Sequence, residues 1–420
     1  MTKHKKIKPR DNNSDNESHF VENPNNSIVM LIFVLGFSII ILSVSSAIFP
    51  GVLLSISGND EFLNPWEINP IGIPLIIISG LVVSLVILNY KQSLPKTFTG
   101  SIKRIQESDL SKKNSLVFLA IILGIYISIS ANELSISEIS QYGDFLIVEE
   151  ALKIWPDGES NNVYVAEQLT RHVRLALLSV SDEIFDNIKI IPYFASISLI
   201  IITYFLTVRL SQKNFAGLIA VVILLQSSTF LRYDTIAVYE NFWVLFYVFS
   251  IYLIFQKPKV SSVSYLLSIF SKAITVLILP VTIIVTLLSD IPKKKKVFVI
   301  TTHIVIVIIS IAIFQFSNTI YGSVIDINTS EFLTGFSTLA FNLRFDVFLL
   351  LFLLPVSIGL FLKARNGSKN AISLMVLLGG IILVTPVLEM MTNFYFVYPY
   401  RYMPLVVFFA ISVSSLFSKR

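Results

Sequence analysis

Long runs without a single charged residue recur along this 420-residue chain, and they constrain its fold more than any other feature. A run of about 20 apolar residues is long enough to cross the hydrocarbon core of a bilayer as a helix. Charged residues make up only 14% of the chain, against roughly a quarter in an average soluble protein. The sequence therefore predicts an all-α, polytopic membrane protein.

Twelve such runs are candidate membrane passes, although several are shorter than a full span. They are Ile28–Asn59, Ile68–Tyr90, Ser115–Asn132, Ile190–Val208, Asn214–Leu231, Asn241–Gln256, Val260–Ser271, Ala273–Ser289, Val297–Ile325, Val347–Leu362, Asn370–Leu388 and Tyr402–Ser418. The first run is too long for the core of a signal peptide, so we interpret it as an uncleaved span. The polar, asparagine-rich residues 1–27 before it are predicted to be disordered.

The basic residues predict the orientation of these passes. If the basic tail is cytoplasmic and the sides alternate, 24 of the 32 Lys and Arg residues lie inside and 20 of the 27 acids lie outside. Cytoplasmic loops of membrane proteins carry an excess of Lys and Arg. We therefore expect a cell-membrane protein with about 12 passes, both termini in the cytoplasm and a long outer loop at 133–189.

One segment, 260–292, is short for the two passes that its flanking charges require. Lys259 and Lys293 both favour the cytoplasm, so the chain must leave and return between them. We expect two short or partly re-entrant helices that meet near Lys272, close to the outer face. Whether each is a full pass stays open.

The organisation that follows has three regions. Residues 1–27 form the cytoplasmic tail, and 28–114 hold two additional N-terminal helices and a basic cytoplasmic loop with a surface helix facing anionic lipid. Residues 115–420 form the main membrane domain. In its outer loop, Leu146, Glu149, Glu150 and Lys153 recur at helical spacing and predict an amphipathic interfacial helix. Trp155-Pro156-Asp157-Gly158 predicts a turn after it.

Asp144 heads this helix and is a candidate for acid–base chemistry at the membrane surface. A carboxylate there could accept a proton from a hydroxyl group or bind a divalent cation. It could equally be a solvated loop acid or the N-cap of the helix. Glu149 and Glu150, with Asp182 and Glu183, compete for the same role.

The few basic residues on the outer side suit recognition of a phosphate or diphosphate. The most telling are Arg171, Arg174, Arg232, Lys272, Arg344 and Arg401. Lys272 and Arg401 interrupt apolar sequence, where an ionisable group is costly and usually functional. The alternative is that they reach lipid headgroups or pair with an acid such as Glu389.

The sequence gives only weak signals for a metal-binding site. The chain has no cysteine and only four histidines, so a thiolate or histidine metal site is not expected. The outer acids could hold Mg²⁺ or Mn²⁺, but no spacing specifies it. His172 could instead position an acceptor, and no nucleic-acid partner is expected.

From about Tyr142 to Pro404 the chain resembles the GT-C superfamily of polytopic glycosyltransferases, in the branch of the protein O-mannosyltransferases and aminoarabinose lipid A transferases. The likeness lies in an ordered series of local patterns. They are Gly143-Asp144-Phe145 followed by Glu149-Glu150-Ala151-Leu152, then Arg232-Tyr233-Asp234 with Glu240, Ser271-Lys272-Ala273, and Pro399-Tyr400-Arg401-Tyr402. His172 stands where the family often has His-Pro-Pro, but both prolines are missing, and the family's second catalytic acid has no clear match.

The resemblance implies an enzyme that transfers a sugar from a polyprenyl-phosphate donor to a lipid, glycan or protein acceptor at the outer face, with inversion. By this likeness Asp144 is the base, and Lys272, Arg401 and Arg232 bind the donor phosphate. Acceptor or secondary roles fall to His172, Arg174, Glu149, Glu150 and Tyr402. Neither the sugar nor the acceptor is specified.

Two other classes stay open from the sequence. One is a transporter or flippase for a lipid-linked or anionic solute, although the paired repeats and broken helices typical of transporters are not evident. The other is a non-catalytic membrane assembly subunit. Convergence of Asp144, Lys272 and Arg401 on one outer cavity favours the enzyme, whereas a polar path to the membrane midplane favours a transporter.

Overall fold

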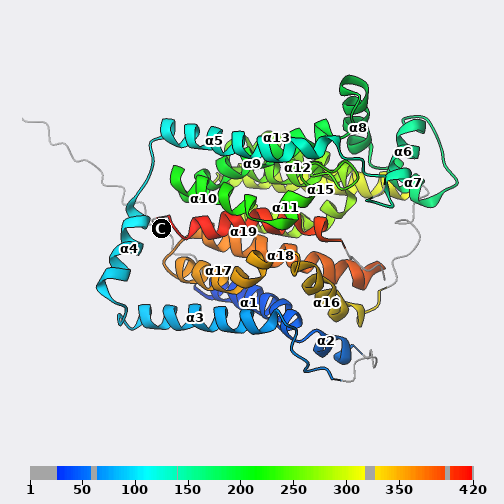
Figure 1. Ribbon diagram of the computed structural model, residues 1–420. Helices are drawn as coiled ribbons and strands as arrows, with labels where there is room; N and C mark the ends of the chain where they lie inside the picture. Colours follow the sequence, from blue (N-terminus) through cyan, green and yellow to red (C-terminus); the bar gives the residue numbers. More distant parts are fainter. Residues whose placement is uncertain (1–25, 58–63, 140, 317–326, 393–397, 419–420) are drawn as a thin grey trace, which may run out of the picture.

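The computed structural model describes residues 26–57, 64–139, 141–316, 327–392 and 398–418. Every regular element in these ranges is a helix, and no strand occurs among them. The longer helices run roughly side by side and form a bundle, shown in Figure 1. The all-helical class predicted from the apolar runs is thus confirmed.

The helices alternate between long apolar elements and short connecting ones. In chain order they are α1 (Asn26–Ile48), α2 (Pro50–Ile56), α3 (Gly72–Tyr90), α4 (Lys96–Glu107), α5 (Lys112–Ser130), η1 (Ala131–Ser135), α6 (Phe145–Ile154), α7 (Val163–Leu169), α8 (His172–Phe185), α9 (Ile190–Ser211), α10 (Asn214–Leu225), α11 (Ser228–Tyr233), α12 (Phe242–Gln256), α13 (Pro258–Ser271), η2 (Ala273–Ile278), α14 (Leu279–Leu288), α15 (Lys293–Phe316), α16 (Glu331–Leu343), α17 (Val347–Arg365), α18 (Lys369–Thr392), η4 (Pro399–Tyr402) and α19 (Met403–Ser415).

Seven stretches in the described residues are long and apolar enough to cross a membrane. They are Met30–Ile48, Gly72–Asn89, Lys112–Ser135, Ile190–Ser211, Lys293–Phe314, Val347–Arg365 and Lys369–Thr392. Shorter apolar stretches lie at 214–225, 242–256 and 273–288. A multi-pass membrane protein is therefore supported by length and composition, and the count of about 12 passes stays a prediction.

The two additional N-terminal helices pack against the C-terminal part of the bundle. α1 contacts α16, α17 and α18, and α3 contacts α17, whereas α5 packs on α10 at the opposite side. α4 lies across one end of the bundle and joins α3 to α5 (Figure 1). The predicted surface helix of the basic loop is thus present as α4.

The opposite end of the bundle carries the outer loop, where α6, α7 and α8 gather (Figure 1). α6 begins at Phe145, and its Lys153 ammonium lies 2.8 Å from the Glu149 carboxylate, as the helical spacing predicts. A turn follows at Trp155, where the amide of Gly158 donates to the carbonyl of Ile154 at 2.7 Å. The helix and turn expected in this loop are confirmed.

The predicted interruption at Lys272 is present. α13 ends at Ser271, Lys272 is extended with φ −158° and ψ 116°, and η2 and α14 follow. Pro280 lies in the first turn of α14, where its missing N–H is not needed. Whether these two short helices are full passes stays a prediction.

Two boundaries differ from the expected ones. The apolar run from Ile28 is not one helix, because α1 ends at Ile48 and Pro50 begins α2. Proline lacks a backbone N–H and clashes with the preceding helical turn, so it starts a new helix instead of continuing the old one. Residues 1–25 of the predicted disordered tail lie outside the described residues, while Asn26 and Ser27 already belong to α1.

The segment between the candidate passes Val297–Ile325 and Val347–Leu362 contains a helix, α16. It packs closely on α18, where a Cβ added to Gly335 would lie 2.5 Å from the Cα of Pro386. That close approach requires glycine. The sequence pattern did not predict α16, because its apolar positions are mixed with polar ones.

Candidate functional site at the outer end

The connection between α11 and α12, residues 234–241, is buried along its whole length. Glu138, itself only 2% exposed, accepts the backbone amides of Ala237 at 2.8 Å and Val238 at 3.1 Å. The Arg174 guanidinium donates to the carbonyl of Val238 at 2.7 Å. The connection is therefore held between Glu138 of the outer loop and Arg174 of α8. These two side chains satisfy backbone groups of the connection that are buried away from water.

Arg174 is held as part of this clamp. Its Nε lies 2.9 Å from a carboxylate oxygen of Glu240, and both side chains are buried. It also donates to Gln168. A buried charge is tolerated when it is paired and hydrogen-bonded, so the arrangement favours a positioning role for Arg174.

Asp144 occupies the N-cap position of α6 without capping it. Its backbone is in the helical region, with φ −76° and ψ −6°, and its side chain accepts no bond from the first turn. The carboxylate instead accepts a hydrogen bond from the Tyr239 hydroxyl at 3.0 Å. Burial and the neighbouring Asp144 carboxylate raise the pKa of Tyr239, which keeps that hydroxyl neutral and able to donate.

Tyr239 lies at the centre of a tyrosine cluster, which we define as Tyr142, Tyr233, Tyr239, Tyr398 and Tyr400. The Tyr239 ring stacks on Tyr400 with centroids 4.4 Å apart and on Tyr398 at 5.7 Å. Tyr142 meets it edge-on at 5.2 Å, and Tyr233 at 5.9 Å. The cluster joins residues from the outer loop, the end of α11, the 234–241 connection and the segment before α19.

Lys272 reaches the same cluster from the interruption between α13 and η2. Its ammonium lies 3.9 Å from the Tyr400 ring centroid and 5.4 Å from that of Trp243, both within cation–π range. Burial would raise the pKa of Tyr400, but the cations Lys272 and Arg401 outweigh burial and lower that pKa to about 8. The outer end therefore concentrates positive charge beside one face of the cluster.

Two further predicted cations border the cluster. The Arg401 guanidinium lies 5.8 Å from the Tyr398 ring and 5.7 Å from the Tyr400 ring, and its Nε donates to the Tyr400 hydroxyl at 3.4 Å. Arg232 is exposed and lies 5.9 Å from the Tyr233 ring. The structure thus brings Asp144, Lys272, Arg401 and Arg232 to one cluster of rings.

Other predicted site residues lie away from these rings. Glu149 pairs with Lys153, and Glu150 is exposed on the same helix. His172 is exposed at the first position of α8, with its ring 6.3 Å from that of Phe270. Tyr402 is buried and accepts a hydrogen bond from Thr385 of α18 at 3.2 Å.

Sequence reasoning missed the two residues that connect the site, Tyr239 and Glu138. Both are ordinary in the sequence, since Tyr239 precedes an apolar helix and Glu138 is one of many outer acids. The available signal was the connection at 234–241, where Asp234 and Glu240 flank apolar residues, because a buried connection must have its backbone groups satisfied.

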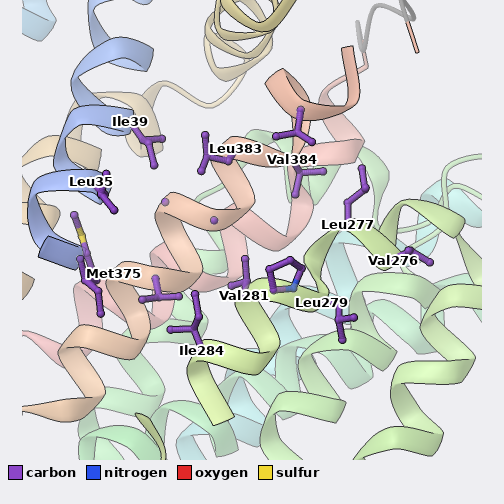
Figure 2. Close-up of a pocket in the computed structure, with 17 residues that line it drawn as sticks. Leu35, Ile39, Val276, Leu277, Leu279, Val281, Ile284, Met375, Leu383 and Val384 are labelled. Carbon is purple, nitrogen blue, oxygen red and sulfur yellow. The ribbon is translucent and has the colours of Figure 1, made fainter. Parts of the chain in front are cut away.

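An apolar groove of about 520 Å³ opens among α1, η2, α14 and α18. Figure 2 shows aliphatic side chains from these elements converging on it. The residues labelled there are Leu35, Ile39, Val276, Leu277, Leu279, Val281, Ile284, Met375, Leu383 and Val384. Part of the lining comes from η2, the helix that directly follows Lys272. The cation and this part of the groove are therefore close in the sequence.

A second cavity, of about 560 Å³, lies between residues 134–139, α6 and α8. Its polar lining includes Glu138, Glu149, Asp182, Glu183 and Lys189. Despite these acids, no group of three or more His, Asp or Glu residues in the described part of the chain has the geometry to hold a metal ion. Binding of Mg²⁺ or Mn²⁺ stays a prediction.

Comparison of the chain with protein-family models, curated proteins and solved structures finds no match. The likeness to the GT-C glycosyltransferases therefore stays a prediction, and the site is interpreted from its own geometry.

Proposed function

We propose that this chain is an integral-membrane glycosyltransferase that takes a sugar from a polyprenyl-phosphate donor at the outer face. One observation carries the proposal: a carboxylate and an ammonium, from Asp144 and Lys272, contact neighbouring rings of one tyrosine cluster. A transfer of this kind needs a base for the acceptor and a positive charge for the leaving phosphate.

In the proposed reaction, the acceptor hydroxyl oxygen attacks the anomeric carbon of the donor sugar, and Asp144 takes the hydroxyl proton. The bond between the anomeric carbon and the phosphate oxygen breaks, and its electron pair leaves with the phosphate. Lys272 and Arg401 stabilise the negative charge that develops there. Attack opposite the leaving group inverts the anomeric centre.

The apolar groove supports a lipid-linked donor (Figure 2). A polyprenyl chain seated among Leu277, Ile284 and Leu383 would leave its phosphate near the interruption at Lys272. Lipid tails are as apolar as these side chains, so close van der Waals packing in the groove, not removal from water, would favour such a seat. The proposal includes about 12 passes, cytoplasmic termini and an outer site.

Sugar transfer by purified wild type and Asp144→Asn, with donor binding measured in parallel, tests the proposal. We expect Asp144→Asn to bind a polyprenyl-phosphate sugar as wild type does while transfer falls roughly 100- to 10,000-fold, the usual contribution of a general base. Asp157→Asn, which makes the same change at an exposed acid of the same loop, is the matched control and is expected to retain transfer.

Two outcomes would contradict the proposal. If wild type binds no lipid-phosphate sugar from a broad panel, a transporter or assembly subunit becomes the better reading. If Asp144→Asn transfers sugar at the wild-type rate, the base is another group. Repeating the wild-type assay after chelation, with Mg²⁺ or Mn²⁺ added back, decides metal dependence.

A further inference from the structure

Tyr239 is buried, and its hydroxyl and its ring contact two different neighbours. The hydroxyl donates to Asp144 at 3.0 Å, and the ring stacks on Tyr400 at 4.4 Å. Tyr400 in turn lies 3.9 Å from the Lys272 ammonium, measured to the ring centroid. The chain thus places one side chain in contact with the acid of the site and, through the Tyr400 ring, links it to the cation.

The buried backbone around Tyr239 is held by hydrogen bonds and an ion pair on both sides of the residue. Glu138 holds the two preceding amides, Arg174 holds the carbonyl of Val238, and Glu240 pairs with Arg174. A connection clamped on both sides of one residue leaves that residue little freedom. The direction of the Tyr239 hydroxyl is therefore set by the fold.

Asp144 depends on Tyr239 for its orientation. It makes no N-cap hydrogen bond to the first turn of α6, and it is half-buried at the edge of the cluster. Among the described residues, the Tyr239 hydroxyl is the one side-chain donor to this carboxylate. A hydrogen bond of this kind fixes the rotamer of the acid that accepts it.

We propose that Tyr239 is the positioning residue of the site. Its hydroxyl orients the Asp144 carboxylate, and its ring, stacked on Tyr400, fixes the position of that carboxylate relative to Tyr400 and Lys272. This inference rests on the proposed base role of Asp144. Tyr239 acts through Asp144 and Tyr400 and takes no proton from the acceptor.

Several other polar and charged groups lie on α6 and on the elements around Asp144, and the experiment must separate them from Tyr239. On α6 they are Glu149, Glu150 and Lys153. On the elements around it they are Glu138, Tyr142, Glu167, Arg232, Tyr233, Tyr398 and Arg401. Substitution of the Tyr239 hydroxyl alone leaves all of these in place.

The test is Tyr239→Phe, which removes the hydroxyl and keeps the ring. We expect kcat for transfer to fall roughly tenfold with little change in donor KM, because a displaced base slows the chemical step without removing a contact to the donor. Tyr233→Phe, which removes a hydroxyl from a neighbouring ring, is expected to lower kcat much less, because the Asp144 carboxylate keeps its hydrogen bond from Tyr239.

A second readout does not depend on transfer. The infrared carboxylate stretch of Asp144, isolated by subtracting Asp144→Asn, is expected to change frequency in Tyr239→Phe, because the carboxylate loses a hydrogen bond. An unchanged kcat together with an unmoved band overturns the positioning role. If wild type transfers no sugar, the proposed function fails, and the infrared band still decides whether Tyr239 holds Asp144.

Discussion

At the scale of single residues, two aromatic rings separate the opposite charges of the candidate site. The Asp144 carboxylate contacts the hydroxyl of Tyr239, whereas the Lys272 ammonium lies over the face of Tyr400. A direct ion pair between these two groups would neutralise both. In the proposed function, this separation leaves the carboxylate available as a base and the ammonium available for the leaving phosphate.

Lys272→Met is predicted to weaken binding of the donor phosphate roughly 10- to 100-fold, because a hydrogen bond to a charged group contributes about 1.5–3 kcal/mol. Binding of a polyprenyl phosphate to purified protein measures the effect. Lys153→Met is the matched control, since that ammonium pairs with Glu149 on the surface of α6. Equal donor binding by Lys272→Met and wild type would remove Lys272 from the donor site.

At the scale of elements, the connection at 234–241 determines the geometry of the site. It carries Tyr239 and Glu240, and it is held to the outer loop by Glu138 and to α8 by Arg174. Burial raises the pKa of Glu138, while its hydrogen bonds to two backbone amides and the nearby Lys189 act against that rise. The Glu138 side chain accepts the hydrogen bonds that water would accept if the connection were exposed.

Glu138→Ala is predicted to destabilise the protein, because each of two buried amides left without an acceptor costs about 1–3 kcal/mol. Glu138→Gln keeps one acceptor oxygen and should lose less. Thermal unfolding in detergent measures both, with Glu150→Ala as a surface control expected to stay within about 0.5 kcal/mol of wild type. If Glu138→Ala unfolds at the same temperature as wild type, Glu138 does not hold this connection in place.

At the scale of the whole molecule, the basic and acidic segments lie at opposite ends of the helical bundle. α4, with its basic residues, lies across one end, and the acidic outer loop with α6, α7 and α8 lies at the other (Figure 1). The tyrosine cluster lies at this second end. Function is therefore expected on the side that the positive-inside rule assigns to the outside.

The absence of cysteine from the chain makes this orientation directly testable. In intact cells, a membrane-impermeant maleimide is predicted to label Asn161→Cys in the outer loop, and to label Ser101→Cys in α4 only after permeabilisation. Both positions are exposed, so accessibility in the fold does not limit the reaction. Labelling of Ser101→Cys in intact cells, with none of Asn161→Cys, would reverse the proposed topology.

Much of the fold could be predicted because a bilayer leaves few choices. Uncharged runs must become helices in hydrocarbon, so the all-helical class and the interruption at Lys272 could be predicted from residue order. The helix at Leu146–Lys153 followed from the helical spacing of its residues. Local chemistry also singled out Asp144, Lys272 and Arg401 as unusual. These features depend on near neighbours in the chain and on the solvent that each segment meets.

The sequence by itself determined the helical membrane class and the charged residues worth testing. Only the tertiary structure decided that Asp144 accepts from Tyr239, that Tyr239 stacks on Tyr400, and that Glu138 clamps the connection between α11 and α12. These contacts join residues about 100 or more positions apart, and none follows from periodicity. They arise because buried backbone and polar groups must find partners, and packing of the whole bundle determines which partners lie within reach.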